Sequence, residues 1–155
     1  MIAVRPGRNP DRSWIREVIR ERWDGDTVVA HGVVHEPAAL PALVAEDGGR
    51  RVGLLTYHVE DEACEIVTID ALEARRGVGA ALIEAAKGLG HRRLWLVTTN
   101  DNVSAQRFYE RAGFRLVAVR AGAVDRARAL KPQIPLGGLG GVEIHDELEY
   151  ELLQA

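Results

Sequence analysis

The feature that most restricts how this 155-residue chain can fold is a turn of sequence RRGVG at residues 75–79. The turn joins a segment typical of a strand to an apolar stripe with helical spacing, and a helix N-terminus attracts anions because it exposes unpaired N–H groups. Gly77 and Gly79 let the backbone come close to a phosphate, where a Cβ atom would block it. Arg75 and Arg76 add positive charge and bidentate donors. The turn therefore indicates an anion-binding site.

Two other phosphate-binding motifs fit this turn less well. A P-loop requires a Gly-Lys-Ser/Thr triplet, which the sequence lacks. A dinucleotide-binding fingerprint requires a small residue at the position of Leu82 and an acidic residue about 20 residues later, and neither is present. Taken alone, the turn also fits a tight strand-to-helix connection whose arginines are solvated.

The pattern of apolar residues along the chain predicts a sheet covered by helices. Helical spacing predicts helices over residues 13–24, 78–89, 102–112 and 123–130. Alternation and apolar runs predict strands over residues 1–5, 40–45, 52–59, 65–72, 93–99, 114–119 and 143–152. Short turns require the second, third and fourth of these strands to form an antiparallel meander. We expect one α/β (α+β) domain over residues 1–155, with a mixed, mostly antiparallel twisted sheet of six to seven strands and about four helices on its faces.

A second motif, N-x-x-A-x-x-F-Y-x-x-x-G-F, occupies residues 102–114. Asn102 is suited to cap a helix, and Tyr109 lies two turns further along the same helical face. Gly113 is suited to the left-handed residue that ends such a helix. This spacing is far more specific than that of the glycine turn.

In order and separation, the two motifs resemble the cofactor-binding motifs of the GNAT superfamily of N-acetyltransferases. The segments LWLVTTNDN at 94–102, KPQIP at 131–135 and IHDEL at 144–148 resemble a group of small, largely uncharacterised bacterial members. The resemblance covers nearly the whole chain. It implies the GNAT fold and an enzyme that transfers acetyl from acetyl-CoA to a primary amine of a small molecule or peptide, by direct attack in a ternary complex. The alternative is a catalytically silent module that senses acetyl-CoA.

The resemblance also implies which residues hold the cofactor. The sheet of the family splays around residues 67–69 and 96–98, and the pantetheine arm of acetyl-CoA would pair there with the backbone of Val67, Thr68 and Ile69. Asn102 resembles an asparagine that contacts the cofactor. The pyrophosphate would bind backbone N–H groups of six consecutive residues: Arg75, Arg76, Gly77, Val78, Gly79 and Ala80. The chain departs from the family pattern at Ala74, where Gln or Arg is usual, and in the short helix after the turn.

Two residues are expected to carry the chemistry. Tyr109 resembles the general acid of the family, which protonates the departing thiolate, and a phenol with a pKa of about 10 can donate to it. Glu65 lies on the strand before the glycine turn, in phase with Val67 and Ile69, and is the first candidate for the general base. A solvated or salt-bridged carboxylate is the other interpretation of Glu65. Asp70, expected on the opposite face, is a weaker candidate.

The remaining titratable residues show no pattern that indicates a site. We expect His145 to lie at the surface and Cys64 to be a small buried side chain. With one cysteine and no Cys and His at metal-ligand spacing, the sequence predicts no metal site. The other histidines lack recognisable partners and are expected to be structural or solvent-facing: His31, His35, His58 and His91.

Composition argues against other classes of function. The formal net charge of -3 gives no general attraction to nucleic acid, and the chain has no apolar run of about 18 residues that could span a membrane. We expect a cytoplasmic monomer or homodimer. The loop at 131–141 is expected to border the acceptor pocket, and four acidic residues near it could favour a cationic amine: Asp125, Glu143, Asp146 and Glu147.

Overall fold

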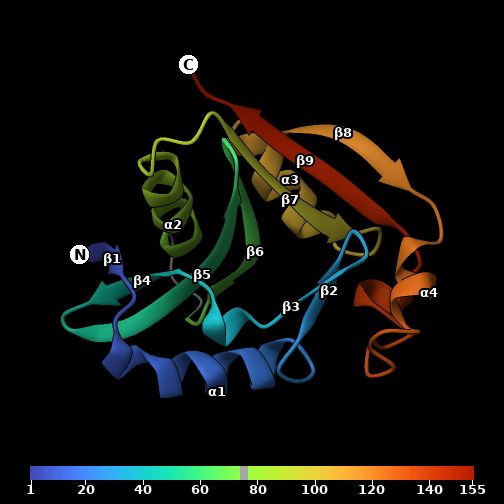
Figure 1. Ribbon diagram of the computed structural model, residues 1–155, viewed down its shortest axis with the longest axis horizontal. Helices are drawn as coiled ribbons and strands as arrows, with labels where there is room; N and C mark the ends of the chain where they lie inside the picture. Colours follow the sequence, from blue (N-terminus) through green and yellow to red (C-terminus); the bar gives the residue numbers. More distant parts are fainter. Residues whose placement is uncertain (74–76) are drawn as a thin grey trace.

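The computed structural model describes residues 1–73 and 77–155, and seven of its strands form one sheet in the order β1-β4-β5-β6-β7-β9-β8 (Figure 1). The strands are β1 (Ile2–Pro6), β4 (Ala42–Asp47), β5 (Arg50–Glu60), β6 (Ala63–Ala71), β7 (Arg93–Thr99), β8 (Arg115–Arg120) and β9 (Glu147–Leu153). Neighbouring strands are antiparallel except β6 and β7, which are parallel. The expected mixed, mostly antiparallel sheet is confirmed.

Helices cover both faces of this sheet. The α-helices among the described residues are α1 (Arg12–Arg22), α2 (Val78–Lys87), α3 (Val103–Arg111) and α4 (Ala123–Ala127). Successive residues of β5 point to opposite faces, and they belong to two separate clusters: Leu54 packs with Ile15 of α1, whereas Leu55 packs with Leu82 of α2. Figure 1 accordingly shows α1 and α2 on opposite sides of β4 and β5. None of the helices described is long and apolar enough to cross a membrane.

A hairpin outside the main sheet was not predicted from the sequence. It consists of β2 (Val28–Ala30) and β3 (Val33–His35), joined by His31 and Gly32 in left-handed conformations with φ of 44° and 80°. Two consecutive left-handed residues are typical of a two-residue hairpin turn. Each strand has three residues. Strands of that length are too short to show an alternating pattern, which explains why they could not be recognised from the sequence.

The parallel strands β6 and β7 separate after three residue pairs. Ala63, Cys64 and Glu65 pair with Arg93, Leu94 and Trp95, and the remaining residues of β6 have no partner on β7. The splay expected around residues 67–69 and 96–98 is therefore confirmed. Glu65 is the last paired residue of β6, so its side chain lies at the point where the two strands diverge.

A β-bulge at Val67 changes which side chains of β6 share a face. On β5, Thr56 pairs with Thr68 while the next residue, Tyr57, pairs with Ile66, so Val67 has no partner there. One additional residue reverses the alternation of side chains along a strand. Glu65 therefore shares a face with Asp70, and the expectation that the two carboxylates point to opposite faces is wrong.

Candidate functional site

A cavity of about 630 Å³ opens where β6 and β7 diverge. Residues 65–70 of β6 and 96–99 of β7 form two of its walls, and Asn102 and Tyr109 line it from the start and the middle of α3. The structure thus brings together six residues that the sequence singled out for catalysis or cofactor binding: Glu65, Val67, Thr68, Ile69, Asn102 and Tyr109.

The loop at 131–141 also lines this cavity. Ile134, Pro135 and Leu139 line it. Lys131 is buried, and its Nζ donates hydrogen bonds to the backbone oxygens of Trp23 and Thr27. These bonds attach the loop to the segment that follows α1.

The glycine turn begins α2, and its two glycines serve different purposes. Gly77 is the N-cap residue with φ of 90°, a left-handed conformation that favours glycine. A Cβ on Gly79 would lie 3.1 Å from Cζ of Phe108, so Gly79 permits close packing of α2 on α3. Residues 77–80 do not line the large cavity, and the predicted anion-binding residues Arg75 and Arg76 lie outside the described part of the chain.

Tyr109 presents a phenol to the cavity from an aromatic cluster. Its ring centroid lies 5.4 Å from that of Phe108, 5.9 Å from that of Phe114 and 6.2 Å from that of Tyr150. Burial and the nearby negative charge of Asp70 raise the pKa of Tyr109 above its ordinary value. The phenol therefore stays protonated at neutral pH, in the form that donates a hydrogen bond or a proton.

Asn102 caps α3, as the sequence predicted. Its Oδ1 accepts a hydrogen bond of 3.2 Å from the backbone N–H of Ala105. Gly113 has φ of 102° at the other end, again as predicted. These two residues fix the position of α3, and hence of Tyr109, beside the diverging strands.

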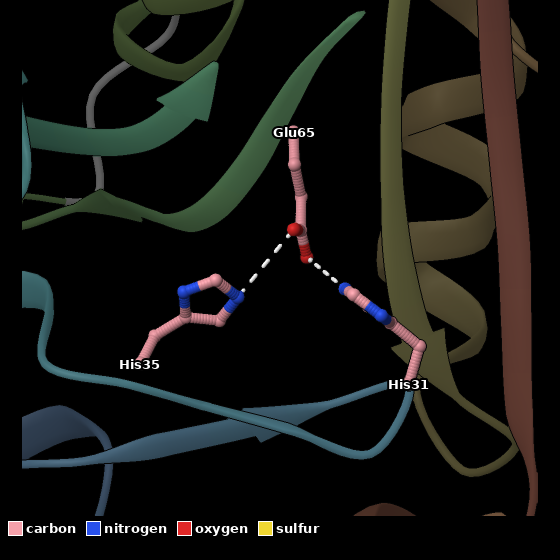
Figure 2. A group of neighbouring side chains, drawn as sticks. All are labelled: His31, His35 and Glu65. Carbon is pink, nitrogen blue, oxygen red and sulfur yellow. Dashed lines mark hydrogen bonds and ion pairs between the residues drawn. The ribbon is translucent and has the colours of Figure 1, made fainter. Parts of the chain in front are cut away.

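Glu65 makes contacts that the sequence did not reveal. Oε2 lies 3.0 Å from Nε2 of His31, and Oε1 lies 3.4 Å from Nε2 of His35 (Figure 2). The expectation that these histidines lack partners is wrong, because the hairpin turn brings them to β6 across more than 25 residues of sequence. Burial opposes ionisation of Glu65, but the hydrogen bond and charge of the histidines outweigh it and lower its pKa. The same hydrogen bond raises the pKa of His31.

The hairpin turn that carries His31 is held by a buried carboxylate. The backbone N–H of His31 donates to both oxygens of Glu147, at 3.2 and 3.1 Å, and the ring of His31 lies 4.7 Å from that of Trp95. Both Glu147 on β9 and Glu65 are about 97% buried. The position of the His31 ring is therefore set by two strands of the main sheet.

Two further acidic residues near the cavity, Asp70 and Asp146, also have partners within the protein. Oδ2 of Asp70 accepts a hydrogen bond of 2.9 Å from Nε1 of Trp23, and burial raises the pKa of Asp70. Asp146 accepts from the backbone N–H of Gly122 and pairs with His145, an exposed side chain as expected. Each of these two carboxylates thus has a hydrogen-bond or ion-pair partner.

Cys64 is fully buried beside Glu65, and it has the structural role expected of it. Burial raises the pKa of its thiol to about 11. The reactive thiolate form is therefore scarce at neutral pH.

The chain is similar to proteins of known family. The model of the acetyltransferase (GNAT) family matches residues 7–114. The Bacillus subtilis protein YdhI, described as uncharacterized, is 31% identical over 153 residues, which cover 96% of this chain and 96% of that protein. A Bacillus subtilis acetyltransferase solved in complex with CoA matches over 100% of both chains, with a TM-score of 0.71 and 18% identity. A GNAT acetyltransferase from Elizabethkingia anophelis solved with acetyl-CoA matches over 99% of this chain and 98% of that one, with a TM-score of 0.71 and 18% identity.

Proposed function

This chain belongs to the GNAT acetyltransferase family, and on that premise we propose that it transfers acetyl from acetyl-CoA to a primary amine of a small molecule or peptide. The observation that carries the proposal is the placement of Glu65 and Tyr109 in the walls of one cavity. A candidate proton acceptor and a candidate proton donor are thereby available to the same reacting centre. Because β1 and β9, from the two ends of the chain, lie in one sheet, we propose that residues 1–155 act as a single domain.

The diverging strands supply a place for the pantetheine arm of acetyl-CoA. Beyond Glu65, the edge of β6 that faces β7 has no strand partner, so its backbone groups at Val67, Thr68 and Ile69 can pair with the amides of pantetheine. Asn102 uses Oδ1 for the helix cap, which leaves the Nδ2 donors for a cofactor oxygen.

The N-terminus of α2 supplies a place for the pyrophosphate. The first N–H groups of a helix have no partner within it, and here they belong to Val78, Gly79 and Ala80. Anions are favoured at such a site by the helix dipole. The sequence places Arg75 and Arg76 directly before it. In this arrangement the cofactor extends from the large cavity to the first turn of α2.

The reaction then needs two proton transfers. Attack of the neutral amine on the thioester carbon forms the C–N bond, and the bulged backbone N–H of Val67 is the candidate donor to the oxyanion. Glu65, ionised at neutral pH, accepts the proton that the attacking nitrogen loses, directly or through a water molecule. The C–S bond breaks as the intermediate collapses, and Tyr109 donates its proton to the CoA sulfur. Solvent restores both side chains to their starting states.

Release of free CoA thiol from acetyl-CoA, measured across a library of amines, tests this proposal. We expect turnover with at least one amine and a strong loss of turnover in Glu65→Gln. The matched control is Glu62→Gln, because Glu62 is exposed in the neighbouring turn and forms a surface ion pair with Arg92. Binding of acetyl-CoA with no thiol release for any amine would favour the sensor interpretation over the enzyme.

A further inference from the structure

A second, smaller cavity lies on the other side of Glu65. It has a volume of about 220 Å³ and is lined by the hairpin, by the end of β5 and by the start of β6 and β7, including His31, His35, His58 and Trp95. Glu65 lines both cavities. The proposed acetyl transfer uses the side of Glu65 that faces the larger cavity, and it gives the two histidines no chemical task.

Three ligand atoms converge beside this smaller cavity. One imidazole nitrogen each from His31 and His35 and a carboxylate oxygen of Glu65 all lie within 4.8 Å of one another. The distances from carboxylate to imidazole are 3.0 and 3.4 Å. Ligands at about 2.0–2.2 Å from a tetrahedral Zn²⁺ lie roughly 3.3–3.6 Å from one another. The two carboxylate-to-imidazole distances are close to this range, and the distance between the imidazole ligand atoms is at most 4.8 Å (Figure 2).

One of these atoms is buried without a hydrogen bond. Nε2 of His35 has no hydrogen-bond partner among the described residues, and its side chain is only 7% exposed. It lies 3.4 Å from Oε1 of Glu65, within ion-pair distance, but the two atoms form no hydrogen bond. A buried polar atom without a hydrogen bond costs about 1–3 kcal/mol, so such an atom beside a cavity is consistent with a missing ligand.

The backbone conformation of His31 is a second observation that indicates a functional site. His31 has φ of 44° at a turn position where asparagine or glycine is favoured. A residue other than glycine in this conformation costs of the order of 1–3 kcal/mol and is often found at functional sites. Glu147 and Trp95 hold this turn so that the imidazole faces Glu65. The ligands are therefore oriented in advance of any ion.

We propose that His31, His35 and Glu65 bind a divalent transition-metal ion of the Zn²⁺ type. Two imidazole nitrogens and one carboxylate oxygen suit Zn²⁺ and its neighbours rather than Ca²⁺ or Mg²⁺, which prefer oxygen ligands. Three protein ligands leave a fourth position open to the small cavity. Arg93, which also lines this cavity, is paired with Glu149 and Glu151 at 2.6 and 2.7 Å, so its charge is already balanced.

Occupancy of this site has a consequence that rests on the proposed function. A carboxylate bonded to a divalent cation is a much weaker base, because the positive charge of the ion disfavours protonation of its oxygens. The metal site and the general base therefore exclude one another, and the bound ion is a reversible inhibitor of acetyl transfer.

Binding is tested with Co²⁺ alone, on protein that carries no polyhistidine tag and has been treated with a chelator. We expect one equivalent of Co²⁺ to produce the intense visible absorption of a tetrahedral site, and Zn²⁺ to displace it. His31→Asn, which suits the left-handed turn, and His35→Asn should each weaken binding at least tenfold. His91→Asn is the control, because His91 lies outside the cluster and should not alter the titration. Absence of a saturable spectrum in the unaltered protein, or equal affinity in all three variants, overturns the proposal.

The inhibition is tested separately by thiol release with an active amine. Zn²⁺ should abolish turnover at the concentration that displaces Co²⁺, and chelator should restore it. Turnover that persists at saturating Zn²⁺ would show that Glu65 does not serve as both ligand and base. If the protein binds Co²⁺ but, once freed of metal, acetylates no amine, the proposed function is refuted and the proposed metal site is still supported.

Discussion

Gly53 provides a test of how tightly α2 packs on the sheet. A Cβ at this position on β5 would lie 2.5 Å from Cγ1 of Val78, 3.1 Å from Cδ1 of Leu82 and 3.2 Å from Cβ of Ala45. Carbon atoms pack best at about 3.5–4.0 Å, so Gly53→Ala requires Val78 to move by roughly 1 Å. Val78 is fully buried and is the first residue of α2, so the helix N-terminus must move with it.

This overlap sets the expected size of the effect. Extra atoms in a well-packed core cost about 1–3 kcal/mol. For a chain of this size, about 2–4 °C of Tm is lost per kcal/mol, so Gly53→Ala should lower Tm by roughly 2–12 °C. The displaced N-terminus of α2 should also weaken the binding of CoA, because the proposed pyrophosphate site uses its N–H groups.

Thermal unfolding and calorimetric titration with CoA measure the two effects. The control is Gly137→Ala, because a Cβ on Gly137 meets no atom within 4 Å. It should leave both Tm and CoA affinity unchanged. If Gly53→Ala were as stable as the unaltered protein and bound CoA equally well, the inference that the close packing of α2 on β5 requires glycine at this position would be refuted.

Three further predictions concern the proposed site. Tyr109→Phe should lower kcat by about 10²-fold or more in the thiol-release assay, since it removes a proton donor but keeps the ring, whereas Tyr150→Phe should have little effect. The pKa of His31 is raised above 6.5, so its contribution to stability is complete below pH 6.5 and is lost as pH rises through the folded-state value. The pKa of Glu65 is lowered below 4.5, so its contribution is present above pH 4.5 and is lost as pH falls through the folded-state value. His31→Asn should therefore destabilise the protein most between about pH 4.5 and 6.5 in urea unfolding, and a difference that does not vary with pH would contradict the pairing. Glu147→Gln should cost about 1.5–3 kcal/mol in the same assay because it removes the charged acceptor for the turn, and a cost near zero would exclude that role.

The structural features that depend only on residues close together in the sequence could be predicted from it. The helix that begins after Asn102 and ends before Gly113 follows from capping preferences, and the structure confirms both ends. The strand over 93–99 was predicted with the bounds that the structure shows. The two motifs also carried the family resemblance, which the family match at residues 7–114 confirms. Local propensity and spacing suffice for such features because their interactions span only a few residues.

The arrangement around Glu65 depended on contacts between distant segments. Its partner His31 is 34 residues away in the sequence, on a hairpin with strands too short to show a periodic pattern. The bulge at Val67 places Glu65 and Asp70 on the same face of the sheet instead of on opposite faces. The residue pattern of the strand did not predict this bulge. Periodicity thus determined the elements of the main sheet and its helices, and the two motifs determined the family, whereas the register between strands decided which side chains meet. Register is set by packing across the whole sheet, so only the tertiary structure could bring two histidines to a buried carboxylate.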